Sequence, residues 1–160
     1  MAGTEPDVVR FESVDARSEP AQQAMAAYFG ELDERFLSGF DPGDAAGADV
    51  ESFDPPTGAF VVVRIGEATV GCGALQTLEP GLGEIKRMWV HPSQRGRGIA
   101  SRLLADLERR CGEMGNRVVR LDTNAVLTEA IGMYERAGYR TIERYNDNPY
   151  AERWFEKHLD

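Results

Sequence analysis

The sequence predicts a single mixed α/β domain, in which one β-sheet is flanked by helices. The chain has 160 residues, enough for one domain with a substantial hydrophobic core. Hydrophobic residues make up 42% and charged residues 28% of the chain, which is typical of a globular protein and excludes extensive disorder. Segments with strand and helix periodicity follow one another over residues 1–160, and neither a repeat nor a linker divides them.

The first half of the chain is predicted to form a strand, a helix, a long loop and a hairpin. Alternation of apolar and polar residues indicates the first strand, and apolar residues at helical spacing indicate the helix. The loop is rich in Gly, Asp, Ala and Pro, and a compact domain rarely keeps such a loop unless it is functional or mobile. Gly66-Glu67 between two apolar runs is typical of a hairpin turn. The expected elements are a strand at 8–14, a helix at 20–40, a loop at 38–58 and strands at 59–65 and 68–78.

The second half is predicted to alternate strands with helices before a final pair of strands. One helix carries apolar residues on a single face from Ile99 to Cys111, and the next ends at Gly138, because glycine is a favoured C-terminal cap. The expected strands are 83–90, 117–122, 139–144 and 151–159, and the expected helices are 99–114 and 128–136.

The acidic charge of the chain is concentrated near its N-terminus. Residues 1–58 hold 13 acidic and 3 basic residues, whereas the remainder is nearly balanced, and the isoelectric point is about 4.8. Phosphate backbones require clustered positive charge, so nucleic acid is excluded as a primary partner. An acidic lobe attracts cationic ligands such as amines, although a solvated acidic surface is the simpler explanation of the charge alone.

Membrane, export and metal features are not found in the sequence. No run of 18 apolar residues predicts a transmembrane helix, and the N-terminal residues lack the pattern of a secretory signal. Cys72 and Cys111 lie in apolar segments and are expected to be buried, free thiols. His91 and His158 have no Cys or carboxylate partner at metal-ligand spacing. We therefore expect a cytoplasmic protein without a metal site.

The most informative stretch runs from a predicted strand through the sequence QRGRGIA at 94–100 into an amphipathic helix. Its glycines let the backbone approach a ligand closely, and the free N–H groups and dipole at the start of a helix favour an anion. Arg95 and Arg97 add positive charge. The pattern indicates a pyrophosphate-binding loop, and it matches neither the Walker A loop nor the dinucleotide fingerprint. The alternative is an exposed basic turn, which the flanking strand and helix disfavour.

Two motifs resemble those of one enzyme family. QRGRGIA is similar to the Q/R-x-x-G-x-G/A signature of the GNAT superfamily of acyl-CoA-dependent N-acetyltransferases, and AIGMYERAGY at 130–139 resembles its second motif. The resemblance implies a central mixed, mostly antiparallel sheet that splays at the acetyl-CoA site, with acetyl-CoA as co-substrate and, as in many members, a homodimer. Residues 59–145 would form the cofactor-binding core, and 15–58 and 145–151 would lie on the acceptor side.

The resemblance also assigns residues to acetyl-CoA. The strand before the signature would pair its backbone with the pantetheine arm, and an Asn after the next strand would contact the same arm. Alternatively, Trp89 packs in the core or lines the acceptor site. Asn124 could instead cap the following helix. The implied cofactor-binding residues are Met88, Trp89 and Val90 on the strand, Arg95, Gly96, Arg97, Gly98, Ile99, Ala100 and Ser101 at the signature, and Asn124.

Glu84 and Tyr134 match the positions of a general base and a general acid in GNAT enzymes. The acceptor amine must lose a proton and the departing thiolate must gain one. Glu84 lies four residues before Met88, which regular alternation places on the same strand face. The alternatives are a surface ion pair of Glu84 with Lys86 or Arg87, and a role for Tyr134 as a buried core aromatic.

The function implied by the resemblance is transfer of an acetyl group from acetyl-CoA to a primary amine of a small acceptor. The acidic first third favours a cationic acceptor. Direct transfer in a ternary complex is expected, because no activated Ser or Cys is evident. The alternatives are a non-catalytic acyl-CoA-binding sensor and an acetyltransferase that modifies protein lysines or N-termini.

Overall fold

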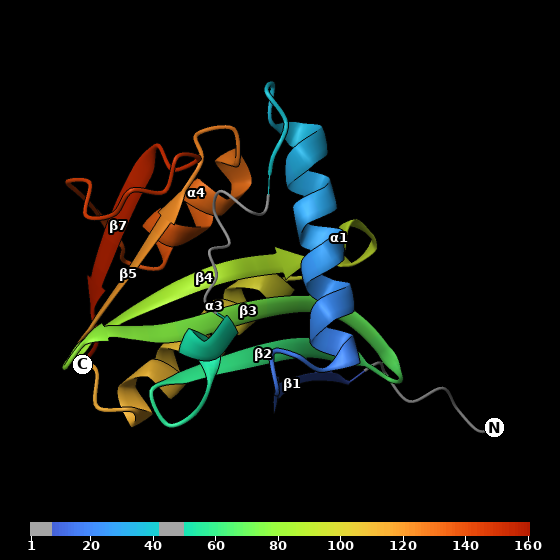
Figure 1. Cartoon of the computed structure of the whole chain (residues 1–160), viewed down its shortest axis with the longest axis horizontal. Coiled ribbons are helices and arrows are strands. Elements are labelled where there is room, and N and C mark those ends of the chain that lie inside the picture. Colours follow the sequence, from blue (N-terminus) through green and yellow to red (C-terminus); the bar gives the residue numbers. More distant parts are fainter. Residues whose placement is uncertain (1–7, 42–49) are drawn as a thin grey trace.

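The computed structural model describes residues 8–41 and 50–160 and shows a seven-stranded sheet with helices on both faces (Figure 1). The strands are β1 (Val9–Val14), β2 (Gly58–Ile65), β3 (Ala68–Glu79), β4 (Leu82–Val90), β5 (Val118–Thr123), β6 (Arg140–Ile142) and β7 (Arg153–His158). The helices are α1 (Glu19–Arg35), α3 (Ile99–Glu113) and α4 (Thr128–Arg136), with short 3-10 turns η1 (Val50–Phe53) and η2 (Pro92–Gln94). The sheet order is β1-β2-β3-β4-β5-β7-β6, in which β4 and β5 are parallel and the other neighbours antiparallel. The predicted mixed, mostly antiparallel sheet is confirmed.

Helix α1 covers one face of the sheet and α3 covers the other (Figure 1). The apolar face of α3 buries Leu103 and Leu107 against one side of the strands, and α4 adds Met133 to the same core. Helix α1 buries Ala24 and Met25 on the opposite side. Burial of these faces is the main force that holds the helices to the sheet.

Helix α1 ends five residues earlier than predicted. The backbone N–H of Phe36 still donates to Leu32, but Phe36 itself is extended, so the chain leaves the helix there. The predicted loop at 38–58 falls partly on residues 42–49, which lie outside the described residues. Its C-terminal part forms η1, where Phe53 is buried against the α1 face of the sheet, a contact that the polar composition of the loop did not predict.

The last two strands are shorter than predicted. Strand β6 has three residues in place of the six expected at 139–144, and it lies at the edge of the sheet, where it pairs with β7 alone. The chain from 143 to 152 leaves the sheet as a loop. The hairpin predicted at Gly66 is confirmed, since Ile65 pairs with Ala68 across it.

The sheet opens between β4 and β5. These strands pair through three residues each, Leu82 to Glu84 with Val118 to Arg120. Beyond Glu84, β4 continues beside β3, and beyond Arg120, β5 continues beside β7. The splayed sheet expected from the resemblance is confirmed, and it leaves the second half of β4 without a strand on one side.

A β-bulge at Arg87 changes which face the side chains of β4 occupy. Lys86 pairs with Ala74 of β3, but Trp89 pairs with Cys72, so β4 uses one residue more than β3. Arg87 has a φ of 56°, a conformation that is uncommon outside glycine. Because of the extra residue, Met88 lies on the α3 side, although regular alternation from Glu84 puts it on the α1 side. The expectation that Glu84 and Met88 share a face is therefore wrong.

The cysteines are free and buried, as predicted. Burial raises the pKa of the Cys72 thiol to about 12 and that of the Cys111 thiol to about 11, so both stay protonated at neutral pH. Within the described part of the chain, no helix is long and apolar enough to cross a membrane. Across residues 8–41 and 50–160, no group of three His, Cys, Asp or Glu side chains is placed to hold a metal ion.

Candidate active site

A groove runs from the loop before α3 along the open side of β4, and we call it the α3 groove. Met88, Trp89 and Val90 form one wall, where β4 has no β5 partner. The start of α3 forms one end, and α1 and α4 complete the sides. Its lining residues are Tyr28, Glu31, Leu32, Arg35, 88–90, 94–96, 98–101, Leu127, Glu129, Ala130, Met133, Tyr134 and Arg136.

The loop at the end of the groove exposes backbone N–H groups. Gly96 and Gly98 have φ values of 81° and 78°, a left-handed conformation that glycine adopts without strain. Gly98 is the N-cap of α3, and among the described residues no side chain caps this end of the helix. Within the described residues, the first N–H groups of α3 therefore have no side-chain acceptor, which suits an anionic group.

Arg95 ties this loop to both β4 and α1. Its Nε donates to the carbonyl oxygen of Val90 at 2.9 Å, and its Nη2 donates to Oε1 of Glu31 at 2.5 Å. Trp89 Nε1 donates to the same carboxylate oxygen at 3.1 Å. Partial burial opposes the charged form of Glu31, but the hydrogen bonds from Arg95 and Trp89 outweigh it and lower the pKa of Glu31.

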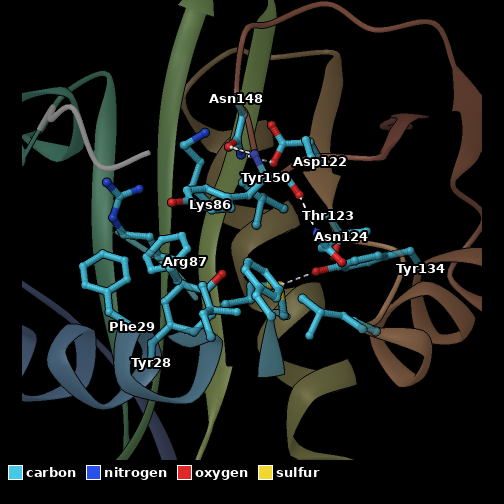
Figure 2. Close-up of a pocket in the computed structure, with 18 residues that line it drawn as sticks. Tyr28, Phe29, Lys86, Arg87, Asp122, Thr123, Asn124, Tyr134, Asn148 and Tyr150 are labelled. Atoms are coloured by element: carbon cyan, nitrogen blue, oxygen red, sulfur yellow. Dashed lines mark hydrogen bonds between the residues drawn. The ribbon is translucent and has the colours of Figure 1, made fainter. Parts of the chain in front are cut away.

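A second opening lies on the α1 face of the sheet, and we call it the aromatic cavity (Figure 2). Six aromatic rings of the described residues line it, from α1, from the segment after α1, from α4 and from the loop before β7. Phe40 is central, because its ring lies 5.4 Å from Phe29 and 4.6 Å from Tyr150. The lining residues are Tyr28, Phe29, Leu32, Phe36, Phe40, 85–88, 122–124, Leu127, Ala130, Tyr134, Asn148, Tyr150 and Ala151.

The polar side of the aromatic cavity is built around Asp122. Its carboxylate accepts from Asn146 Nδ2 at 2.5 Å and from Asn148 Nδ2 at 3.1 Å. Lys86 and Arg87 of β4 lie across the cavity from it (Figure 2). Charged groups of both signs therefore line a largely aromatic space.

Tyr134 lies where the α3 groove and the aromatic cavity meet. Both openings are lined by Tyr134 and Met88, and the Tyr134 hydroxyl donates to Met88 Sδ at 3.9 Å (Figure 2). Burial raises the pKa of Tyr134, and the charge of Asp122 raises it further, so the phenol stays protonated at neutral pH. A ligand in each opening would thus meet beside this hydroxyl.

Comparison with known proteins agrees with this arrangement. The profile of the family described as "Acetyltransferase (GNAT) family" matches residues 17–139. The chain belongs to the GNAT family. It is 34% identical over 138 residues to the IAA acetyltransferase of Azospirillum brasilense, covering 85% of this chain and 88% of that protein. The protein is thus an acyltransferase, and the resemblance noted in its motifs is confirmed.

Solved structures support the GNAT fold. A GNAT-family acetyltransferase from Staphylococcus aureus has a TM-score of 0.80 and 18% identity, with 96% of this chain and 100% of that one covered. A GNAT acetyltransferase from Elizabethkingia anophelis, solved with acetyl-CoA bound, has a TM-score of 0.67 and 14% identity, with 94% and 98% covered.

The predicted residues of the GNAT signature are brought together with one exception. The expected cofactor-binding positions at 88–90, 95, 96 and 98–101 all line the α3 groove. Arg97 does not, because its guanidinium donates to the side chain of Gln94 on the outside of the loop. The ring of Trp89 packs in the α1-side core, as the alternative expected, and the residue also lines the groove.

Glu84 lies outside both openings. It is 2% exposed, and its carboxylate accepts from Tyr145 Oη at 2.5 Å, Gln76 Nε2 at 2.7 Å and Asn146 Nδ2 at 3.3 Å. Lys86 Nζ lies 3.4 Å from it, so this ion pair is buried and not the surface pair considered as the alternative. Asn146 Nδ2 donates to both Glu84 and Asp122, so it connects Glu84 to the aromatic cavity, and the role of Glu84 as the general base stays a prediction.

Asn124 lines the aromatic cavity and not the α3 groove of this GNAT protein. Its Nδ2 donates to the carbonyl oxygen of Tyr150 at 2.8 Å, and its Oδ1 accepts from the N–H of Val126 at 3.0 Å. The N-cap of α4 is Leu127, so the alternative that Asn124 caps this helix is wrong. Asn124 joins the end of β5 to the loop before β7.

Sequence reasoning missed Asp122 and the aromatic lining. Asp122 follows the alternation of β5, which puts it on the opposite face from Leu121, and that face becomes the cavity. The sequence could have indicated Phe29, Phe36 and Phe40 as lining residues. The first helical segment has more aromatic side chains than one packing face needs. Tyr150 is distant in sequence, and no local pattern links it to them.

Proposed function

We propose that this chain transfers an acetyl group from acetyl-CoA to the primary amine of a small molecule, by direct transfer in a ternary complex. The observation that carries the proposal is the junction of the α3 groove and the aromatic cavity at Tyr134. One opening suits the donor and the other the acceptor, and the two ligands meet at a group that can donate a proton. The acceptor side then draws on residues 28–40 and 148–151, which supports the assignment of 15–58 and 145–151 to acceptor binding.

The α3 groove fits acetyl-CoA. The loop glycines and the uncapped start of α3 offer N–H groups to the pyrophosphate, with Arg95 beside them. The open edge of β4 at Met88 to Val90 offers backbone groups to the amides of the pantetheine arm, as an added strand would use them. Acetyl-CoA supplies a thioester, whose C–S bond breaks as the bond between nitrogen and the acetyl carbon forms.

Asp122 is the proposed proton acceptor for the acceptor ammonium. Its carboxylate lines the aromatic cavity and is held by two neutral amides, Asn146 and Asn148, which leave its charge uncompensated. Within the described residues, no Lys, Arg or His lies within ion-pair distance of Asp122. An ammonium ion can therefore bind this carboxylate and lose its proton there. Glu84 supports Asp122 through Asn146.

Tyr134 is the proposed proton donor. Its raised pKa keeps the phenol protonated, and its hydroxyl already lies against the sulfur atom of Met88 at the junction. A hydroxyl there can donate to the departing sulfur and so stabilise the thiolate as the C–S bond breaks.

A small-molecule acceptor has support from the relative in Azospirillum brasilense, whose name gives IAA as what it acetylates. The charge argument for a cationic acceptor has less support. Of the acidic residues between 8 and 41 and at 50–58, none lines the aromatic cavity. The homodimer and the cytoplasmic location stay predictions.

Calorimetric titration of the full chain with acetyl-CoA, with ATP as a control, tests the donor site. We expect micromolar binding of acetyl-CoA and no comparable binding of ATP. Thiol release from acetyl-CoA in the presence of a panel of primary amines tests the transfer. Absence of acetyl-CoA binding by the folded protein would contradict the proposal, and binding without thiol release for any amine would contradict the catalytic part of it.

A further inference from the structure

We propose that the acceptor is an amino acid with an aromatic side chain, or a closely related aromatic amino carboxylic acid. Its carboxylate would bind at Lys86 and Arg87, its ammonium at Asp122 and its ring among Phe29, Phe40 and Tyr150. This inference rests on the proposed function and names the acceptor of that reaction.

The two cations reach the aromatic cavity because of the bulge in β4. Consecutive side chains of a regular strand point to opposite faces, so one of Lys86 and Arg87 would normally point away. The bulge, with Arg87 at a φ of 56°, lets both residues line the cavity (Figure 2). A positive φ at a non-glycine residue is costly and recurs at functional sites. Both residues therefore place a positive charge at the border of the cavity, and a ligand carboxylate binds well beside such charges.

Lys86 keeps hydrogen-bonding capacity for a ligand. Its ammonium has three N–H donors, and its ion pair in the described structure is with Glu84 at 3.4 Å. The Glu84 carboxylate already accepts from three neutral donors, Gln76, Tyr145 and Asn146. The Lys86 side chain is 21% exposed and borders the cavity. A carboxylate in the cavity can therefore accept from Lys86 without displacing a donor from Glu84.

Asp122 provides the opposite charge on the other side of the same space. Figure 2 shows Lys86 and Arg87 on one side of the cavity and Asp122 and Tyr134 on the other. An ammonium bound to Asp122 lies on the side where the α3 groove joins the cavity at Tyr134. A ligand that carries both an ammonium and a carboxylate, as an α-amino acid does, can place one charged group against each side of the cavity.

The remaining wall of the aromatic cavity is apolar and favours a ligand with an aromatic ring. Phe29 and Phe40 stack at 5.4 Å with an interplanar angle of 25°, and Phe36 and Tyr150 stack at 5.6 Å with 27°. Arg87 lies over the Phe29 ring at 5.8 Å, so its guanidinium joins the cation pair to this wall. Aromatic side chains pack well against such rings, and an unbranched polyamine has no group that would fill them.

The electrostatics of the cavity differ from those of the chain as a whole. Although the first 58 residues are strongly acidic, their described members that line the cavity are aromatic or aliphatic. Glu31 of α1 lines the α3 groove and binds Arg95. Among the residues that the structure describes, the lining charges are Lys86, Arg87 and Asp122, which suit a zwitterion better than a ligand with several positive charges.

Matched pairs of acceptors test this inference with the full chain. Thiol release from acetyl-CoA is measured with phenylalanine and phenethylamine, with tryptophan and tryptamine, and with spermidine. The members of each pair differ in the carboxylate alone. We expect kcat/KM to be at least 10-fold higher for the amino acid of each pair, and lower still for spermidine. A preference for the decarboxylated amines or for spermidine would overturn the inference and leave the proposed acetyltransferase function intact.

Substitutions at Lys86 give the second arm. Lys86→Gln should bring the ratio of kcat/KM between phenylalanine and phenethylamine close to one, and Lys86→Arg should keep most of it. Lys157→Gln is the matched control, because Lys157 is the other lysine of the chain and pairs with Glu108 away from the cavity. An unchanged ratio in Lys86→Gln would overturn the assignment of the carboxylate. Failure of the wild-type chain to bind acetyl-CoA or to release thiol with any acceptor would overturn the proposed function together with this inference.

Discussion

Glu31 on α1 and Arg95 in the loop before α3 form an ion pair of 2.5 Å between Oε1 and Nη2. The helix that walls the aromatic cavity is thereby connected to the loop that begins the α3 groove. Arg35, one turn further along α1, makes a similar connection to Glu129 of α4 at 2.6 Å. Both sides of the groove are thus connected to α1 by ion pairs. An anion that binds Arg95 in the loop would compete with Glu31 of α1, the helix that lines the acceptor side.

Glu31→Gln should strengthen acetyl-CoA binding. The substitution removes a negative charge next to the Arg95 guanidinium, which is then free to bind the pyrophosphate. We expect an affinity gain of roughly 5-fold, since a partly exposed charge pair contributes at most about 1 kcal/mol. Calorimetry measures the dissociation constant, and Glu34→Gln on the exposed side of α1 is the control. Weaker binding would show instead that Glu31 positions Arg95 for the cofactor.

Gly98→Ala should weaken acetyl-CoA binding by roughly 5- to 10-fold, because a left-handed φ of 78° costs about 1 kcal/mol or more with a side chain present. The added methyl meets no atom within 4 Å, so the strain is in the backbone alone. Gly112→Ala in α3 also meets no atom within 4 Å and should leave binding unchanged while raising stability by up to about 1 kcal/mol. Equal dissociation constants for the two variants would exclude a role for the loop conformation.

Tyr134→Phe should lower kcat by about 100-fold if the hydroxyl donates a proton, with little change in the dissociation constant of acetyl-CoA. Tyr139→Phe is the matched control, because Tyr139 is buried in the same core and donates to Glu108 at 2.7 Å. Loss of the Tyr139 hydroxyl should reduce the stability of the protein and leave kcat near the wild-type value. The two variants are compared by steady-state thiol release and thermal unfolding. An unchanged kcat in Tyr134→Phe would remove the phenol from the mechanism.

Asp122→Asn should lower kcat/KM by about 100-fold near neutral pH. The loss should shrink as the pH rises toward the pKa of the acceptor amine, because more of the amine is then already unprotonated. Acetyl-CoA affinity should stay the same, since Asp122 does not line the α3 groove. Asp147→Asn, in the loop that also carries Asn146 and Asn148, is the control, because Asp147 is exposed. A pH–rate profile parallel to that of the wild type would argue against proton acceptance by Asp122.

Glu156→Gln should make stability less sensitive to acid. The hydrogen bond from Arg140 and a further one from Arg120, both at 2.9 Å, lower the pKa of Glu156 to about 2 although burial opposes this. A carboxylate with a lowered pKa stabilises the fold fully above its unfolded pKa, and this contribution is lost as the pH falls from about 4.5 toward 2. Between pH 6 and pH 3, the wild type should therefore lose about 2 kcal/mol more free energy of unfolding than the variant.

Urea unfolding at several pH values measures this difference. Glu143→Gln serves as the control, because Glu143 is exposed in the segment after β6. Parallel curves of unfolding free energy against pH for the wild type and Glu156→Gln would contradict the prediction.

The elements and the anion-binding loop were predictable because their determinants are local. Glycines at 96 and 98, a preceding strand and a following amphipathic helix stand next to one another in the sequence. The helix from Thr128 to Arg136 was predicted with its observed bounds for the same reason. The second motif singled out Tyr134, and this residue lies at the junction of the two openings.

The face of each β4 side chain was not predictable, because nothing local marks the bulge. Arginine is an unexpected residue at a positive φ, and no glycine or proline accompanies it. Its conformation is supported by tertiary contacts, in which the guanidinium lies over Phe53 at 5.1 Å and Phe29 at 5.8 Å. Those rings come from segments more than 30 residues away, so alternation alone put Glu84 on the wrong side relative to Met88.

The parting of β4 from β5 gives this sheet a third edge, inside the molecule. Ordinary sheet edges invite pairing with strands of other chains, which is one origin of aggregation. Here the unpaired stretch of β4 lies at the bottom of a groove between α1, α3 and α4. A slender, extended ligand in the groove can reach its hydrogen-bonding groups. The unpaired backbone groups of β4 are thus available to a small molecule, while their place between the helices limits pairing with strands of other proteins.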